Sequence, residues 1–280
     1  MSVMAPAVDK KLTGLVAATF TPFTLQGEIN LSEIGPYIDY LKEKQGVNSI
    51  FVNGTTGESM SLSVAERKIL AEEWCQKAKG KMDQVVVQVG CMSLKDSQEL
   101  ARHAAQIGAD GIAVIAPSFF KPDTAVLARD VLEDIEKRIP SFRGVKFSGS
   151  DLMDFGQCVS YSQSHWSVLY GMDEQLLAAL AMGAHGAVGS TYNYVARHVN
   201  ELISAFEKGD IVQARTIQFK MQELLGYAKK IGFDLGVNKQ LMIEVSGLCL
   251  GPPRLPLMPC PHAHAVSIAQ KYHSIFPELN

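Results

Sequence analysis

Two kinds of hydrophobic segment alternate along the chain. Short apolar runs rich in β-branched residues recur, and each is followed by a turn and then by apolar residues at helical spacing. This alternation is typical of βα units on a parallel sheet. Because the short runs are almost continuously hydrophobic, we expect both faces of each strand to be buried. The predicted strands are residues 14–19, 49–53, 85–89, 111–116, 144–147, 168–170 and 186–189.

The helical segments carry their own start and stop signals. Ser63 and Glu66 are spaced as a capping box, and a helix opened by Ser93 ends at Gly108. Apolar residues at helical spacing predict another helix over 127–139. Beyond Asn193 helices follow without strands, at about 195–208, 211–230, 239–248 and 262–273. The pattern therefore predicts a single α/β domain over 1–280, with a TIM-barrel-like part of about seven βα units (12–208) and a C-terminal helical extension (209–280).

Composition narrows the class of partner. The 280 residues include 26 basic and 29 acidic side chains, for a net charge of −3, and no basic run resembles a phosphate-backbone footprint. We therefore expect a small-molecule substrate and neither nucleic acid nor a membrane as partner. Five widely spaced cysteines without a CxxC pair fit a reducing compartment, and no segment has the character of a membrane span or signal peptide. A cytoplasmic location follows as an expectation.

Lys146 is the best candidate nucleophile. It lies in the middle of a predicted buried strand, where burial lowers the pKa of an ammonium group and favours the neutral amine that forms a Schiff base. The alternative is a lysine at the mouth of the barrel paired with a carboxylate. By strand alternation, Ser148 lies on the same face as Lys146.

Polar residues follow three other strands, at the barrel end where catalytic groups gather. Thr55 and Thr56, between two glycines, could hold a carboxylate or phosphate, or form an ordinary strand-to-helix turn. Gly171, Asp173 and Glu174 follow one later strand, and Ser190 follows the next. These residues could bind a polyhydroxylated ligand, although Asp173 or Asn193 could instead cap a helix and 189–191 could bind a phosphate. His262 and His264 lack partners at metal-ligand spacing, so no metal is expected.

Six segments together carry a resemblance that no one of them would carry alone. They are 19–23 (TFTPF), 54–58 (GTTGE), 144–148 (GVKFS), 171–174 (GMDE), 189–193 (GSTYN) and 251–257 (GPPRLPL). In this order they resemble the vertebrate N-acetylneuraminate lyases, a branch of the pyruvate-dependent class I aldolase family that includes dihydrodipicolinate synthase.

The resemblance implies an activity and a role for each matching residue. The reaction would be reversible cleavage of N-acetylneuraminate to N-acetylmannosamine and pyruvate, with no metal or organic cofactor. Lys146 would form the Schiff base, and Thr55 and Thr56 would hold the pyruvate carboxylate. The residues that would contact the sugar-derived chain are Ser148, Gly171, Asp173, Glu174 and Ser190. The family also implies a homotetramer.

One departure from the family affects the chemistry. After residues 116–122 the family continues through a helix and a strand with a YYYHIP-like sequence, whose tyrosine transfers a proton. Here Pro122 passes directly into what resembles the next helix, so about thirty residues, the size of one βα unit, are missing. Loss of a positioned acid or base costs about 10² to 10⁴ in rate. We therefore expect a lyase homologue with severely reduced or lost activity.

Other functions remain open on the sequence. A non-catalytic sialic acid or keto acid binding protein, or an oligomer partner of an intact lyase, would need no proton-transfer tyrosine. An unrelated barrel enzyme could bind a phosphorylated substrate at 189–191. Tyr170 or Tyr192 could substitute for the missing tyrosine, although neither lies on the matching strand.

Overall fold

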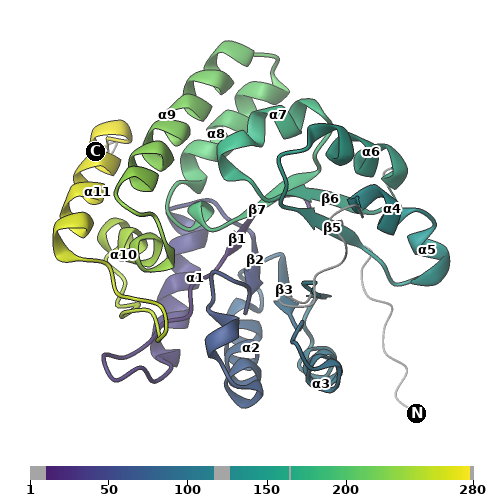
Figure 1. Cartoon of the computed structure of the whole chain (residues 1–280), viewed down its shortest axis with the longest axis horizontal. Coiled ribbons are helices and arrows are strands. Elements are labelled where there is room, and N and C mark those ends of the chain that lie inside the picture. The colour runs from purple at the N-terminus through teal and green to yellow at the C-terminus, as the bar shows by residue number, and fades with distance from the viewer. Residues whose placement is uncertain (1–10, 117–126, 164, 278–280) are drawn as a thin grey trace.

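A curled, parallel seven-stranded sheet forms the centre of the computed structural model, and helices cover its outer face (Figure 1). The structure describes residues 11–116, 127–163 and 165–277. The strands are β1 (Gly14–Ala18), β2 (Ser49–Val52), β3 (Gln84–Gln88), β4 (Gly111–Ala113), β5 (Gly144–Phe147), β6 (Ser167–Tyr170) and β7 (Gly186–Gly189). Their order is β4-β3-β2-β1-β7-β6-β5. The seven predicted strands and the α/β architecture are thus confirmed.

Helices follow the strands and then continue alone to the C-terminus. The α-helices are α1 (Ile34–Glu43), α2 (Val64–Ala78), α3 (Leu94–Gln106), α4 (Ala128–Leu132), α5 (Ile135–Arg138), α6 (Leu152–Ser162), α7 (Leu176–Ala181), α8 (Ala196–Glu207), α9 (Ile211–Lys230), α10 (Leu235–Ser246) and α11 (His262–Ile275). The 3-10 helices are η1 (Leu31–Glu33), η2 (Ser59–Ser61), η3 (Asp173–Gln175) and η4 (Thr191–Asn193). In Figure 1, α9, α10 and α11 lie together on one side of the sheet.

The sheet stays open between β4 and β5. Within the described residues, each of these strands pairs with one neighbour, β4 with β3 and β5 with β6. The missing βα unit falls between these two strands in the sequence. Its junction at Pro122 and Asp123 lies outside the described residues. The seven units therefore form an open half-barrel.

The end strands correct the expectation that both faces of every strand are buried. Ile112 of β4 is 49% exposed, and the predicted strand 111–116 ends at Ala113. All four residues of β6 and of β7 are buried, because each of these strands has a neighbour on both sides. Loss of a neighbouring strand thus explains the exposure.

The predicted helix over 127–139 is also wrong as a single element. It is divided into α4 and α5, because Asp134 adopts a left-handed conformation with φ +56° and interrupts the helical backbone. Aspartate is among the few non-glycine residues that adopt this conformation readily. α10 begins four residues earlier than predicted, where the Asp234 side chain accepts a hydrogen bond from the amide of Val237.

Alternation along the strands separates an outer core from an inner one. Leu15 and Ala17 of β1 pack outward against the helices, whereas Val16 and Ala18 face the inside of the curled sheet. Leu169 and Val188 join them on the inner face. Because side chains alternate along a strand, every second residue points to this inner face. Polar side chains at those positions can contact a ligand bound inside the curled sheet.

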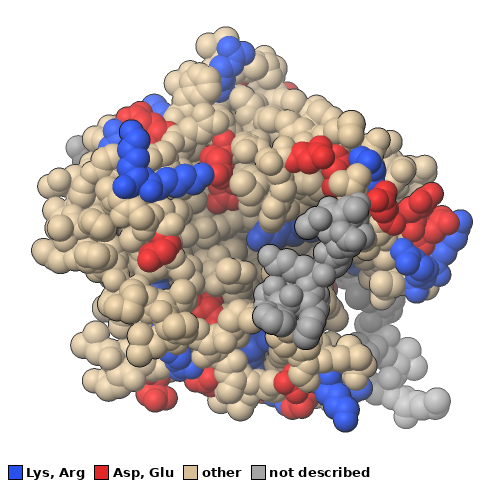
Figure 2. All heavy atoms as spheres, in the orientation of Figure 1, with Lys and Arg blue, Asp and Glu red and all other residues tan. Residues whose placement is uncertain are grey.

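Charged side chains of both signs are interspersed over the face shown in Figure 2. The molecule is hollowed near the centre of this face, where acidic and basic atoms are both visible. Within the described ranges, no helix combines the length and the apolar character that a membrane crossing requires.

Candidate active site

A cavity of about 180 Å³ opens at the carboxyl ends of several strands of the sheet. Six of the eight residues predicted from the sequence line it: Thr56, Lys146, Gly171, Asp173, Glu174 and Ser190. They come from the ends of four different strands, β2, β5, β6 and β7, which the parallel sheet brings to the same edge. The two others, Thr55 and Ser148, are exposed to solvent outside this lining.

Lys146 projects from β5 onto the inner face of the half-barrel. Its register partner on β6 is Leu169, a member of the inner core, and its ammonium nitrogen lies 5.7 Å from the centre of the Phe51 ring on β2. The expectation of a strand buried on both faces is wrong at Lys146, whose side chain is exposed because β5 ends the sheet. The surrounding protein atoms nevertheless lower the pKa of Lys146, and the charge of Asp173 opposes this effect.

Asp173 is the buried carboxylate of the cavity. It accepts hydrogen bonds from the hydroxyl of Thr191 at 2.6 Å and from the amide of Thr191 at 3.1 Å, so it binds the loop after β7 and does not cap the helix that follows it in the sequence. Burial raises its pKa, while the two Thr191 bonds and the charge of Lys146 act in the opposite direction. Since the carboxylate occupies the amide and hydroxyl of Thr191, these donors are unavailable to a phosphate. A phosphate-binding site at 189–191, the alternative that the sequence left open, is therefore disfavoured.

Two glycines make room for these side chains. A Cβ atom added at Gly189 would lie 2.0 Å from Oδ1 of Asp173. A Cβ added at Gly171 would lie 2.2 Å from Oγ of Ser148 and 2.9 Å from Cε of Lys146. Any larger residue at either position would have to displace a group that lines or borders the cavity.

Hydrogen bonds from Asn193 and from α10 hold the loop after β7 in place. The Asn193 amide donates to the carbonyls of Ala18 and Ser190, at 2.7 Å each, so Asn193 braces the loop rather than capping α8. Asn238 of α10 donates to the Ser190 hydroxyl at 2.9 Å. Ser190 is thus oriented at the cavity by a residue of the helical extension.

Neither candidate replacement tyrosine lines the cavity. The hydroxyl of Tyr170 lies within hydrogen-bond distance of two acceptors on the outer side of the sheet, the carbonyl of Gly149 at 3.0 Å and the side-chain oxygen of Gln175 at 2.9 Å. The hydroxyl of Tyr192 is buried beside Asp173 without a well-aligned hydrogen bond among the described residues. Burial and the Asp173 charge raise the pKa of Tyr192 well above its usual value. A hydroxyl that is enclosed in this way is badly placed to exchange protons with a ligand.

The extension supplies cavity residues that the sequence reasoning missed. Leu225 and Lys229 of α9 and the following Phe233 line the cavity mouth. The ammonium of Lys229 pairs with Glu174 at 2.9 Å. Leu225 and Lys229 are four residues apart and therefore share one helix face, but their position over the barrel depends on how α9 packs. Their spacing alone could not have placed them in the site.

The chain matches known proteins over nearly its whole length. The Dihydrodipicolinate synthetase family matches residues 11–131 and 124–273. The N-acetylneuraminate lyase of Danio rerio is 59% identical, covering 95% of this chain and 97% of the relative, and that of Homo sapiens is 49% identical, covering 95% and 93%. The solved N-acetylneuraminate lyase (sialic acid aldolase) of Aliivibrio salmonicida is 33% identical and superposes with a TM-score of 0.90, covering 96% of this chain and 99% of that chain.

The lengths of these alignments indicate gaps that together equal about one βα unit. The Danio rerio alignment spans 297 positions but covers 95% of the 280 residues, so roughly thirty positions have no counterpart in this chain. The two family matches meet at 124–131, directly after the junction predicted from the sequence. By sequence and fold, the chain belongs to the Dihydrodipicolinate synthetase family.

Proposed function

We propose that the chain is a homologue of the N-acetylneuraminate lyases that retains Schiff-base chemistry at Lys146 but turns over slowly. The observation that carries this proposal is the position of Lys146. Its amine shares one cavity with a buried carboxylate, Asp173, and with two hydroxyl residues, Thr56 and Ser190. The lowered pKa of Lys146 increases the fraction of neutral amine, which is the nucleophile.

The chemistry follows from the Lys146 amine. The neutral nitrogen adds to the ketone carbon of the substrate, and loss of water leaves a protonated imine. As the bond between carbons 3 and 4 breaks, the hydroxyl of carbon 4 loses its proton and N-acetylmannosamine leaves as the aldehyde. The electron pair moves to the imine nitrogen and forms an enamine. Protonation of carbon 3 and addition of water then release pyruvate and restore the amine.

The slow step is the proton transfer at the hydroxyl of carbon 4. In the family this role belongs to the tyrosine of the absent segment, and Tyr170 and Tyr192 do not reach the cavity. A positioned acid or base contributes about 10² to 10⁴ in rate. Imine formation with pyruvate alone does not need this transfer, so we expect it to be retained.

The open gap between β4 and β5 favours a second candidate function. A protein that binds a keto acid or sialic acid needs the cavity but no proton-transfer group, and one that joins an intact lyase in an oligomer needs neither. The family resemblance also leads us to expect a homo-oligomer, a tetramer, which light scattering during size-exclusion chromatography tests.

Trapping with sodium borohydride separates the two functions. We expect pyruvate and borohydride to give a reduced adduct on Lys146, located by peptide mass mapping, and Lys146→Ala to abolish it. Release of N-acetylmannosamine at a measurable rate supports the lyase. Saturable binding without an adduct would support the binding protein instead.

A further inference from the structure

Glu58 is the most enclosed charged side chain near the cavity, and the mechanism does not use it. The side chain is fully buried, and the backbone has φ +58°, a left-handed conformation that is uncommon for glutamate. Such a conformation persists only where the surroundings impose it. Glu58 lies two residues beyond Thr56, which lines the cavity. Contacts that fix the position of Glu58 therefore also restrict the position of Thr56.

The C-terminal extension supplies both partners of this carboxylate. The ammonium of Lys239, from α10, lies 3.0 Å from Oε1, and the backbone amide of Arg254 donates to Oε2 at 2.7 Å. The Lys239 side chain is 1% exposed, and it also donates to the carbonyl of Pro252. Lys239 and Arg254 both stack on the ring of Phe23, at 4.4 and 4.7 Å.

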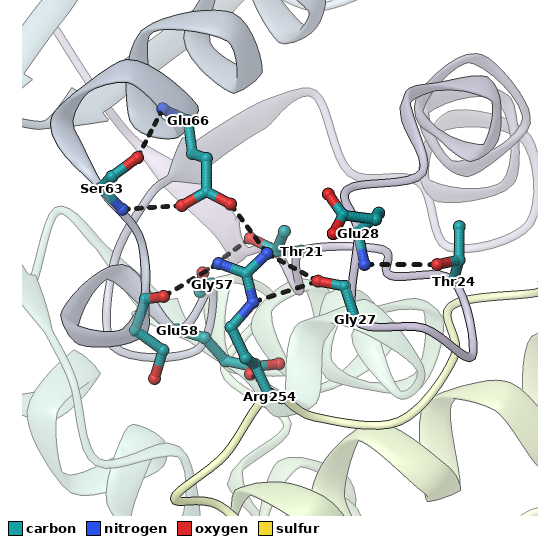
Figure 3. Close-up of polar contacts among 10 residues, drawn as sticks. Thr21, Thr24, Gly27, Glu28, Gly57, Glu58, Ser63, Glu66 and Arg254 are labelled. Carbon is teal, nitrogen blue, oxygen red and sulfur yellow. Dashed lines mark hydrogen bonds and ion pairs between the residues drawn. The ribbon is translucent and has the colours of Figure 1, made fainter.

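Arg254 is itself held firmly in place, as Figure 3 shows. Its guanidinium donates to the carbonyls of Gly27 and Ser61 and pairs with Glu66 at 2.8 Å. Glu66 also belongs to the capping box that starts α2. The amide that binds Glu58 is therefore anchored to two separate parts of the half-barrel.

The loop from 54 to 59 transmits this anchoring to Thr56. The amide of Glu58 donates to the carbonyl of Thr55 at 3.0 Å, and the hydroxyl of Thr21 donates to the carbonyl of Gly57 at 2.6 Å. The two neighbours of Thr56 in the sequence, Thr55 and Gly57, are thus each held by a hydrogen bond. A shift of Glu58 has to move Thr56 with it.

Stability alone does not account for such a pair. Taking two charges out of water costs about as much as their attraction returns, and well-packed neutral residues of similar volume often serve the fold equally well. A buried pair does, however, fix two elements in one register. We propose that Glu58 and Lys239 are positioning residues through which the helical extension holds Thr56 against the carboxylate of a keto acid bound at Lys146. This inference rests on the proposed function.

The test compares two ketones, one with a carboxylate and one without. Half-saturation of the borohydride-trapped Lys146 adduct is measured for pyruvate and for hydroxyacetone. In Glu58→Gln/Lys239→Met, which removes both charges together, we expect half-saturation by pyruvate to rise about tenfold, with hydroxyacetone unchanged and the maximal adduct yield retained. The control Glu223→Gln/Lys271→Met removes a solvent-accessible pair of the same residue types and should change neither value.

A second variant and a double-mutant comparison guard against misfolding. Glu58→Gln alone leaves one acceptor oxygen for two donors, the Lys239 ammonium and the Arg254 amide, so it should also raise the pyruvate value and show the same preference. In a Thr56→Val background, removal of the pair should add nothing further. An equal rise for both ketones, or an unchanged pyruvate value, would overturn the positioning role while the proposed function stands. A wild-type protein that forms no adduct would overturn both.

Discussion

Gly189→Ala tests how tightly the cavity carboxylate is packed. The new Cβ would lie 2.0 and 2.3 Å from the two oxygens of Asp173, and Cβ atoms essentially never approach another heavy atom within 3.0 Å. The carboxylate must therefore move by about 1 Å, which takes the Thr191 hydroxyl and amide out of hydrogen-bond range. These bonds now measure 2.6 and 3.1 Å.

The magnitude follows from the two lost bonds. A hydrogen bond to a charged group contributes about 1.5 to 3 kcal/mol, so we expect the free energy of unfolding to fall by about 3 kcal/mol or more. Gly226→Ala is the matched control, because a Cβ there meets no atom within 4 Å and Gly226 lies inside α9. Alanine in a helix interior should raise stability by about 1 kcal/mol.

Urea unfolding of the two variants decides the matter, with pyruvate trapping as the functional measurement. The expected outcome is an early transition and a weaker Lys146 adduct for Gly189→Ala, and a slightly later transition with a normal adduct for Gly226→Ala. If Gly189→Ala unfolds within about 1 kcal/mol of the wild type, the contact between Gly189 and Asp173 does not constrain the site as described.

Three further predictions concern charge and the open edge. The negative charge of Asp173 raises the pKa of Lys146, so Asp173→Asn should move the pH midpoint of adduct formation to lower pH; a midpoint that stays or rises contradicts the coupling. Burial lowers the pKa of Lys239 to about 8; the charge of Glu58 opposes this decrease and that of Arg254 adds to it. In the unfolded chain the same ammonium group keeps its ordinary pKa of about 10.5. Deprotonation therefore favours the folded state, and the free energy of unfolding of the wild type should rise between about pH 8 and 10.5 relative to Glu58→Gln/Lys239→Met; a constant difference would refute it. Ile112→Lys on the exposed end strand β4 should reduce aggregation in light scattering and change stability by less than about 0.5 kcal/mol, and unchanged aggregation would show that this edge is already protected.

The sequence predicted the elements well where local signals determine them. The seven strands and the capping box at Ser63 follow from short-range patterns, and the structure confirms both. Strand alternation put Lys146 and Ser148 on the same face, and Lys146 lines the cavity whereas Ser148 does not. The exposure of Lys146 could not be predicted, because it depends on β5 having no neighbour on one side, which is a property of the whole sheet.

Residues distant in sequence were the harder part of the site. Lys239 and Arg254 lie 181 and 196 positions beyond Glu58, and nothing local in the sequence connects them. One signal was available: Lys239 lies three residues before the buried Met242 in α10, so it falls on an apolar helix face where a lysine needs a partner. The sequence could not identify that partner, because its identity depends on how the extension packs on the barrel.

The central claim is that Lys146 forms a Schiff base with pyruvate in an open, seven-stranded half-barrel. Intact-protein mass spectrometry after treatment with pyruvate and borohydride tests it most directly. The expected result is a mass increase of one reduced pyruvate per chain, mapped to Lys146 and absent from Lys146→Ala. An unmodified wild-type chain at saturating pyruvate, or an adduct that persists in Lys146→Ala, would contradict the claim.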